Sequence, residues 1–338
     1  MSLGFAIIFF VVLTVIIGVA GTQLTKAADQ LADLTGFGEA LVGGILLGAI
    51  TSISGIITSV TAAFEGQPEL AFSNAIGGIA AQTVFLAIAD IAYSRANLEH
   101  ASASFTNLLQ GVLLISMLSF VVVIMAADTV TLWGIHPASF FLIAIYIFGT
   151  KLISSAKKHP MWKPAETKET VEDIPDDDNQ KNVSLTSLII RFALLAIVVA
   201  FAGYFIAQSA IVITTNSGIS ASFMGALFTS VATSLPELVV SVSAVRRGAL
   251  TLAVSNIIGG NSFDVLFLTF ADMALREGSI YHAATNSQLF VLALTILLVS
   301  ILLMGLLHRQ KYGLARVGWE SILMVSCFII GYILLYLM

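Results

Sequence analysis

The stretch Thr51-Ser52-Ile53-Ser54-Gly55 has a counterpart 182 residues later in the chain, Thr233-Ser234-Leu235-Pro236-Glu237. The same offset places Ser73-Asn74 on Ser255-Asn256 without a gap. Between residues 43 and 90, 18 of the 48 positions are identical to their counterparts, and several of these are polar, which shared apolar composition would not select. An internal duplication in an apolar chain is typical of transporters built from structural repeats. We therefore expect the functional site where the two copies meet.

The composition indicates a membrane protein. Of the 338 residues, 58% are hydrophobic and only 10% are charged, whereas soluble domains contain roughly 25% charged residues. Ten apolar runs are each long enough for the roughly 20 residues that cross a bilayer as a helix, and backbone groups in lipid must be satisfied within the segment. The predicted spans are 4–22, 38–63, 70–93, 106–127, 132–154, 186–211, 219–245, 250–274, 287–307 and 316–337. The expected fold is an all-α membrane protein with ten transmembrane helices.

The basic residues predict the orientation of these helices. With ten spans, 14 of the 15 Lys and Arg residues fall on one side of the membrane, and Arg276 alone falls on the other. The positive-inside rule makes the basic side cytoplasmic. We therefore expect both termini outside, in a multi-pass protein of the plasma (inner) membrane whose partners are the bilayer and small cations. A nucleic-acid partner is not expected, and the oligomeric state is open.

A charged segment divides the chain into two halves. Residues 156–184 are poor in apolar residues and include Asp176-Asp177-Asp178, a composition typical of a flexible, solvated linker. We expect a first five-helix repeat at 1–155, an acidic cytoplasmic linker at 156–184 and a second five-helix repeat at 185–338. Because each half has an odd number of spans, the second must enter the membrane from the opposite face, so the repeats are inverted.

The motif Thr233-Ser234-Leu235-Pro236-Glu237 lies inside the seventh predicted span. Proline within a helix removes a backbone hydrogen bond and clashes with the preceding turn, so a helix break is expected here, with carbonyl and hydroxyl oxygens nearby. A carboxylate at membrane depth is costly unless it meets a cation, a proton or a partner. The combination predicts that Glu237 belongs to an ion site. The alternative is a kinked helix with a buried, protonated glutamate in a structural network.

The eighth predicted span carries a second motif, Ser255-Asn256-Ile257-Ile258-Gly259-Gly260-Asn261-Ser262-Phe263-Asp264. Paired glycines permit close helix approach or an irregular turn. Asp264 follows Gly260 by four residues and thus shares its helix face, and Asn256 offers a further amide oxygen. Glycine packing alone would explain the glycines but not an aspartate in an apolar span.

Together the two motifs resemble the α-repeat of the Ca²⁺/cation antiporter superfamily, the sodium/calcium exchanger family, in its bacterial-type form. The resemblance covers nearly the whole chain and implies two five-helix halves and a central cytoplasmic loop. It also implies that the first and sixth spans slide across a rigid core, which Gly18 or Gly203 could ease. The resemblance assigns ion binding to Thr233, Ser234, Glu237 and Asp264, to a carbonyl at Ser230 and to the small residue Gly260.

The first half departs from the family pattern. Where the family has Pro-Glu, this chain has Ser54-Gly55, and Gln82 stands opposite Asp264. The expected site therefore has two carboxylates, both from the second half. Its neutral ligands or positioning residues would be Thr51, Ser52, Asn74, Gln82, Thr233, Ser234 and Asn256.

These features predict a secondary active cation antiporter with no enzymatic activity and no cofactor beyond the transported Ca²⁺, Na⁺ or H⁺. Two carboxylates can neutralise one Ca²⁺, which takes six to eight oxygen ligands. Na⁺/Ca²⁺ exchange is the first hypothesis, and cation/proton exchange (Ca²⁺/H⁺ or Na⁺/H⁺) is the second. A non-transporting protein that keeps the fold, or a channel, is also compatible with the sequence. Asp90 and Asp272, which match at the repeat offset, are expected to have structural hydrogen-bond or helix-end roles.

Overall fold

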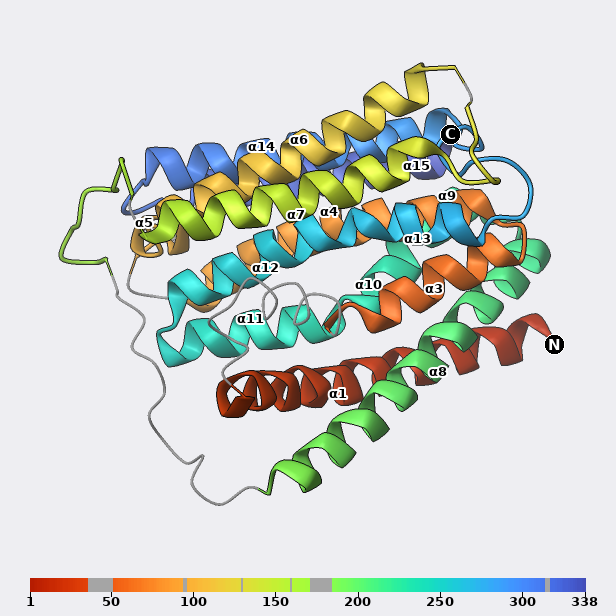
Figure 1. Cartoon of the computed structure of the whole chain (residues 1–338), viewed down its shortest axis with the longest axis horizontal. Coiled ribbons are helices and arrows are strands. Elements are labelled where there is room, and N and C mark those ends of the chain that lie inside the picture. Colours follow the sequence, from red (N-terminus) through yellow and green to blue (C-terminus); the bar gives the residue numbers. More distant parts are fainter. Residues whose placement is uncertain (36–50, 94–95, 129, 159, 171–183, 314–316) are drawn as a thin grey trace.

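The computed structural model describes residues 1–35, 51–93, 96–128, 130–158, 160–170, 184–313 and 317–338. In these residues the regular structure is helical, apart from one isolated bridge between Leu132 and Ile135. Most helices run along the long axis of a bundle (Figure 1). Both chain termini lie at one end of the bundle, which we call the terminal end, and α5 and residues 160–170 lie at the other, which we call the linker end.

The helices share a high apolar content and most are long. Their bounds are α1 Leu3–Thr35, α3 Ile53–Phe64, α4 Pro68–Ala92, α5 Leu98–Ala101, α6 Phe105–Ala126, α7 Pro137–Lys158, α8 Leu185–Ser217, α9 Ala221–Phe223, the π-helix η2 Met224–Thr229, α10 Ser230–Thr233, α11 Leu235–Arg247, α12 Leu250–Asp264, α13 Leu266–Ala274, α14 Asn286–His308 and α15 Trp319–Leu337.

Among the described residues, eight helical segments are long and apolar enough to cross a membrane. A ninth candidate is the bent pair Ala221–Thr233 and Leu235–Arg247, with an angle of 48° between its two parts. The chain is therefore a multi-pass helical membrane protein, as predicted. The predicted span 38–63 is described only from residue 51 onward, where α3 contributes 12 residues, so the described residues do not test the count of ten.

Helix bounds recur at the repeat offset well beyond the segment in which the sequences match. The 33-residue helix α8 begins and ends 182 positions after α1. Helix α4 spans Pro68–Ala92, and α12 and α13 together span Leu250–Ala274, again 182 positions later. The duplication therefore extends to helices whose sequences have diverged.

The helices differ in how much protein surrounds them. In its most apolar window α4 is 78% buried, whereas α1 is 28% and α8 is 17% buried. Helices α1 and α8 pack against each other (Figure 1) and present most of their remaining surface outward. Helix α4 is thus the centre of the bundle, and its polar residues are shielded from lipid.

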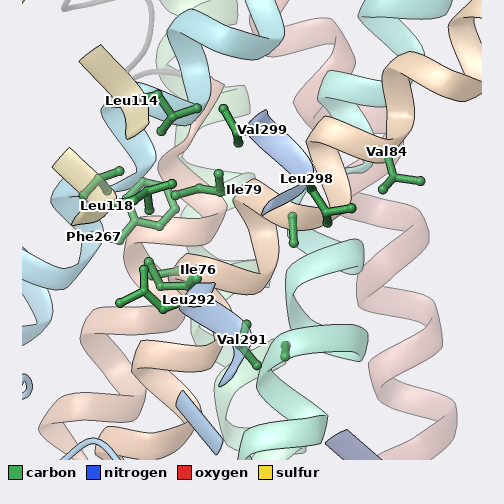
Figure 2. Packing of buried hydrophobic residues seen from close by; sticks show 14 of the residues in the cluster. Ile76, Ile79, Val84, Leu114, Leu118, Phe267, Val291, Leu292, Leu298 and Val299 are labelled. Atoms are coloured by element: carbon green, nitrogen blue, oxygen red, sulfur yellow. The ribbon is translucent and has the colours of Figure 1, made fainter. Parts of the chain in front are cut away.

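The core around α4 is built from leucine, isoleucine and valine side chains. Figure 2 shows Ile76 and Ile79 of α4 with Leu118 of α6 and Leu292 of α14. All four side chains are fully buried. This packing with α14, and with α6 in the same cluster, holds α4 from the side that faces away from α1 and α8.

Helix α4 approaches the π-helix η2 closely because both carry glycine at the contact. A Cβ on Gly77 would overlap the backbone of Ala226, and one on Gly225 would lie 2.7 Å from the carbonyl oxygen of Leu70. The close approach expected of paired glycines thus occurs at Gly77 in the first half. At Gly259 and Gly260 the nearest atoms are 3.5 and 4.0 Å from such a Cβ, and α12 continues without a break to Asp264.

Helix α1 is longer than the predicted span 4–22 and reaches Thr35. Its second half remains useful to the fold because Ala20 and Leu24 pack in a small cluster with Val199 of α8. A hydropathy pattern underestimates such a helix, since polar residues separate the apolar ones beyond Gly21.

Candidate functional site

Two serines at equivalent positions mark breaks in the helices. Ser52 precedes α3 with backbone angles φ −93° and ψ 10°, and Ser234 precedes α11 with φ −100° and ψ 5°. Pro236 falls in the first turn of α11, where its missing N–H costs no helical hydrogen bond. The break expected at the proline motif is confirmed. The first half has the same local backbone without a proline.

A small cavity of about 10 Å³, roughly the space of one water molecule, lies between these breaks and the helices α4, α12 and α13. Its lining residues come from both halves of the chain. They are Ser52, Gly55, Asn74, Gly78, Gln82, Thr233, Ser234, Glu237, Asp264 and Phe267. The structure thus brings together seven of the eleven site residues expected from the sequence, and adds Gly55, Gly78 and Phe267.

Asp264, the last residue of α12, is held by polar groups from the other half. Its Oδ1 accepts a hydrogen bond from Ser52 Oγ at 2.6 Å, and its Oδ2 accepts one from Gln82 Nε2 at 2.7 Å. The same Gln82 nitrogen donates to Ser234 Oγ at 3.1 Å. The two contacts are equivalent: Ser52 of the first half bonds to Asp264 of the second, and Ser234 of the second half bonds to Gln82 of the first.

Three buried oxygen atoms around the cavity accept no hydrogen bond from the described residues: Glu237 Oε2, Gln82 Oε1 and Asn74 Oδ1. The orientation of both amides follows from their nitrogens. Asn74 Nδ2 donates to Ser59 Oγ at 2.8 Å and to the Gly55 carbonyl oxygen at 3.3 Å, which leaves its oxygen free. A buried acceptor without a donor is costly. Oxygen atoms of this kind are suitable ligands for a cation such as Ca²⁺.

The cavity carries two carboxylates that are almost completely shielded from solvent. The side chains of Glu237 and Asp264 belong to residues that are 7% and 2% exposed, and no Lys or Arg is among the lining residues. Buried carboxylates without a basic partner are strongly destabilising unless a cation or a proton neutralises them. The site is therefore chemically suited to cations and unsuited to anions.

Phe267 occupies the place where a second glutamate would stand. Gly55 is the counterpart of Glu237, and a Cβ on Gly55 would lie 2.5 Å from Cε2 of the Phe267 ring. Phe267 is not among the site residues expected from the sequence. The internal repeat aligns Phe267 with Phe85, which marks both residues for attention. It does not indicate that the Phe267 ring packs on Gly55.

The other four expected residues do not line this cavity. The Ser230 carbonyl oxygen accepts hydrogen bonds from Ser234 N at 3.1 Å and from Thr233 Oγ1 at 3.2 Å. Both donors belong to its own helix segment, so this oxygen already has partners. A Cβ on Gly260 would lie 4.0 Å from Gln82 Oε1, next to the lining. Asn256 and Thr51 are half-buried and lie outside the lining set.

Asp90 and Asp272 are confirmed as structural residues. Asp90 accepts hydrogen bonds from Leu98 N at 2.7 Å, Gly318 N at 3.0 Å and Ser321 Oγ at 3.1 Å. Asp272 accepts them from Ile280 N at 3.0 Å, His136 N at 2.8 Å and Ser139 Oγ at 2.9 Å. The partners of the two aspartates correspond at the 182-residue offset: Leu98 to Ile280, His136 to Gly318 and Ser139 to Ser321. Each aspartate ties together three segments at one end of the bundle.

Known proteins share both the sequence pattern and the fold. Two relatives match nearly end to end: CaxA of Alkalimonas amylolytica is 25% identical over 97% of each chain, and the inner membrane protein YrbG of Escherichia coli (strain K12) is 25% identical over 93% of this chain and 91% of that one. Among solved structures, the H⁺/Ca²⁺ exchanger CAX superimposes with a TM-score of 0.68 at 13% identity, covering 98% of this chain and 86% of that one. The sodium-calcium exchanger NCX_Mj superimposes with a TM-score of 0.59 at 17% identity, covering 97% and 98%.

The model of the family "sodium/calcium exchanger protein" matches residues 5–152 and 187–337, which is nearly all of the chain outside the charged segment. The match covers both helix breaks and every residue that lines the cavity. Together with the carboxylates and free oxygens of that cavity, it establishes that this chain belongs to the sodium/calcium exchanger family.

Proposed function

We propose that this protein is a secondary active antiporter that exchanges Na⁺ for Ca²⁺ across the membrane at the cavity around Glu237 and Asp264. The observation that carries the proposal is the group of buried, unpaired oxygens of Glu237, Gln82 and Asn74 beside a second carboxylate. Oxygen is the ligand atom that Ca²⁺ and Na⁺ prefer. Ser52 and Ser234, which contact Asp264 and Gln82, add hydroxyl oxygens at the same place.

Charge explains how the two ions would be coupled. Ca²⁺ brings two positive charges and Glu237 and Asp264 bring two negative ones, so one bound Ca²⁺ leaves the site neutral. Na⁺ ions would use the same carboxylates, and neither ion can bind fully while the other holds them. Exchange follows from this competition, because leaving two bare carboxylates at membrane depth is costly.

We further propose that the halves 1–155 and 185–338 are inverted repeats joined by the linker 156–184, and that the cavity opens alternately to the two sides. Support comes from the contacts between equivalent positions: Gln82 bonds to Asp264, and Asn261 Nδ2 bonds to Ile79 O at 3.4 Å. The two residues of each pair occupy equivalent positions in the two halves. Equivalent positions can contact each other only close to the symmetry axis that relates the halves. In a transporter, such an axis permits two equivalent packings, one facing each side.

For orientation, we propose that the linker end is cytoplasmic and the terminal end faces outward in a plasma membrane. The described basic residues support this, since Arg309 and Lys311 lie at the linker end with residues 165–170. Lys157 and Lys158, in the last turn of α7, precede the same segment.

Exchange of a cation for protons is a second candidate, and Gly55 favours it. With Phe267 packed on that position, the site holds two carboxylates and no third. Two protons, one on each carboxylate, would balance one Ca²⁺ without any further acidic group. The fold similarity to an H⁺/Ca²⁺ exchanger is compatible with this alternative.

A flux assay on purified protein in liposomes tests both candidates. Vesicles loaded with Na⁺ and diluted into Na⁺-free buffer should take up ⁴⁵Ca²⁺ if Na⁺ drives the exchange. Vesicles given only a pH step should take it up if protons do. Glu237→Gln keeps the size of the side chain and removes its charge, so its uptake should fall to the level of protein-free vesicles.

Glu166→Gln and Glu277→Gln are matched controls. Both residues are exposed, and each substitution removes one negative charge at a place away from the cavity. These variants should transport like the unmodified protein. Normal uptake by Glu237→Gln would contradict the site assignment. Absence of flux of ⁴⁵Ca²⁺ or ²²Na⁺ under every gradient, in protein that remains folded, would contradict the antiporter proposal and support a non-transporting member of the family.

A further inference from the structure

A second pair of acidic side chains lies at the linker end, away from the cavity. Glu99 is in the short helix α5, and Glu320 is in the first turn of α15. Each residue is only 1% exposed. Asp90 beside them is eight residues beyond Gln82 on α4, which is about 12 Å along a helix. The pair is therefore separate from the proposed transport site.

The carboxyl groups of the two glutamates meet at one junction and have no polar partner among the described residues. Their chain neighbours Leu98 and Ser321 both bond to Asp90, and none of the four buried glutamate oxygens takes part in a described hydrogen bond. A buried carboxylate that is ionised and has no donor is costly, whereas a protonated carboxyl group is neutral and can donate to a neighbouring oxygen. The pair is therefore suited to hold a proton.

The backbone around Glu320 is shaped to hold this side chain. A Cβ on Gly305 of α14 would lie 2.5 Å from Glu320 Cγ, and a Cβ on Gly318 would overlap its carboxyl group. Any other residue at these two positions would displace the glutamate. The side chain is thus enclosed by main chain on two sides, which also keeps water and counter-ions away from it.

Nearby basic groups in the described residues have other partners. The Arg309 guanidinium donates to the carbonyl oxygens of His100 and Ala165 and to Thr170 Oγ1. Lys311 Nζ pairs with Glu169 Oε1 at 2.6 Å, and His100 Nδ1 contacts the Arg309 carbonyl oxygen at 2.6 Å. Arg309, Lys311 and His100 therefore form no described ion pair with Glu99 or Glu320.

The remaining elements packed around the pair add one basic group, and it lies at the surface. His308, the last residue of α14, is exposed and packs against Trp319, and its charge, when it is protonated, acts favourably on Glu320. The first ten residues of α12 contain no titratable side chain, and α4 contributes Asp90, whose oxygens accept from backbone and serine donors. Arg95 and Arg316 lie outside the described residues. Burial, with the negative charges of Asp90 and Glu320, raises the pKa of Glu99 well above its ordinary range.

We propose that Glu99 and Glu320 form a proton-binding site, distinct from the transport cavity, that holds one shared proton and thereby keeps the linker end of the bundle closed. Loss of the proton leaves two negative charges enclosed beside Asp90, which pushes α5 and α15 apart. Both helices are bonded to Asp90, through Leu98 N and Ser321 Oγ. Residues 165–170 are bonded to the same junction through Arg309, so the proton state also reaches the start of the charged linker.

The proposal predicts the sign of the pH dependence of stability. Because the pKa of Glu99 is raised in the folded protein, its contribution to stability is complete at low pH and is lost as pH rises through the folded pKa. Thermal unfolding of detergent-purified protein from pH 5 to pH 9 should therefore show a midpoint that declines toward alkaline pH. Glu99→Gln and Glu320→Gln, which each remove one buried titrating group, should each show a clearly smaller decline; the part that remains comes from the other buried carboxylates, Glu237 and Asp264.

Controls separate this site from other acidic groups. Glu166→Gln removes a charge from an exposed residue at the same end, and Glu277→Gln does so at the opposite end. Both should keep the pH profile of the unmodified protein. Parallel profiles for the glutamine variants and the unmodified protein would overturn the proposal.

Infrared spectroscopy provides a readout that does not depend on stability or on transport. The unmodified protein at neutral pH should show the C=O stretch of a protonated carboxyl group that shifts in D₂O and decreases in Glu99→Gln. If that variant fails to fold, Glu320→Gln serves the same purpose from the other partner. A spectrum that neither variant changes would show that the pair holds no proton. A failure of the flux assay would leave this test unaffected, because the proton site is measured without a transported ion.

Discussion

At the scale of single residues, the amides of the cavity show how neutral side chains can prepare a cation site. Gln82 and Asn74 each have one nitrogen and one oxygen, and hydrogen bonds to Ser234, Asp264, Ser59 and the Gly55 carbonyl fix the nitrogens. The oxygens are therefore left facing the cavity. The Gln82 nitrogen also offsets part of the Asp264 charge, which a carboxylate at position 82 could not do. A glutamine opposite an aspartate makes the two halves complementary where two acids would repel.

The contact between Gly55 and Phe267 leads to a prediction about affinity. Gly55→Glu alone should bring no gain in Ca²⁺ affinity, because its Cβ meets the Phe267 ring. The double variant Gly55→Glu/Phe267→Ala opens that space and adds a third carboxylate to the site. We expect its Ca²⁺ affinity, measured by competition against ⁴⁵Ca²⁺ binding, to increase roughly tenfold or more, because affinity in such sites follows the number of charged ligands.

Phe267→Ala alone is the control for this experiment. Loss of a buried phenylalanine costs about 3–5 kcal/mol of stability, so folding must be verified by gel filtration for both variants. Equal affinity of the double variant and Phe267→Ala, with both folded, would mean that the Gly55 position does not face the ion.

The sequence predicted the residues with local signals and missed those that depend on long-range packing. Glu237 and Asp264 were predictable because a carboxylate in an apolar span is unusual, and Ser52 and Gln82 because the repeat maps them onto Ser234 and Asp264. Phe267 was not, because its role comes from a contact with a glycine more than 200 positions away. The pair of Glu99 and Glu320 was missed for the same reason: Glu99 lies between predicted spans and Glu320 at the start of the last one, and neither segment indicates that the two residues meet.

At the scale of elements, α1 and α8 each place a glycine on the helix break of the opposite half. Gly21 of α1 meets Pro236, and Gly203 of α8 meets Ser54, which is the counterpart of Pro236. Thr58 Oγ1 also donates to the Gly203 carbonyl oxygen at 3.0 Å. The sequence pointed to Gly18 and Gly203, but a Cβ on Gly18 would meet Leu235 only at 3.5 Å, which is an ordinary contact distance. The symmetric pair of close contacts is therefore Gly21 and Gly203.

These contacts predict a rate effect if α1 and α8 move during transport, as the proposed alternating access requires. A Cβ on Gly203 would lie 2.7 Å from the Ser54 carbonyl oxygen, so Gly203→Ala must push α8 away from α3. Overpacking typically costs about 1–3 kcal/mol, and a barrier raised by about 1.4 kcal/mol slows a step tenfold. We expect a roughly tenfold lower maximal exchange rate with an unchanged half-saturating Ca²⁺ concentration, because no cavity residue is altered.

Gly4→Ala is the matched control, since a Cβ at Gly4 has no atom within 4 Å. This variant should exchange at the normal rate. A Gly203→Ala protein with full rate, or one that loses Ca²⁺ affinity in proportion to rate, would contradict the idea that the contact limits helix movement.

Element boundaries were predictable only where composition changes. Hydropathy located α4, α6 and α14 to within a few residues, but it ended α1 at residue 22, thirteen residues before the observed end at Thr35. The proline motif indicated the break before α11, whereas the equivalent break at Ser52 has no proline. There the repeat carried the information, because the offset of 182 residues places Ser52 opposite Ser234.

At the scale of the whole molecule, both ends of the bundle are fastened by one aspartate with the same set of partners. Asp90 bonds to Leu98 N and Ser321 Oγ, and Asp272 bonds to Ile280 N and Ser139 Oγ. The two ends differ beyond this framework. At the linker end Glu99 and Glu320 stand where the terminal end has Tyr281 and Ala138. The two halves thus share one set of hydrogen bonds and both line the cavity in the middle, while the side chains around the two aspartates differ.

The arrangement of the two halves can be tested by the sidedness of three positions. Cys327 is the only cysteine, so Cys327→Ala provides a background into which Ser2→Cys, Lys163→Cys or Met338→Cys is introduced. A membrane-impermeant maleimide applied to intact cells should label the cysteines at 2 and 338 but not the one at 163, because the basic linker end is expected to be cytoplasmic. All three should react after permeabilisation. Labelling of both termini requires an even number of spans in total, and protection of position 163 requires an odd number before the linker. Only two halves of opposite orientation satisfy both conditions, so opposite sidedness of the termini, or labelling of all three positions in intact cells, would exclude the inverted repeat.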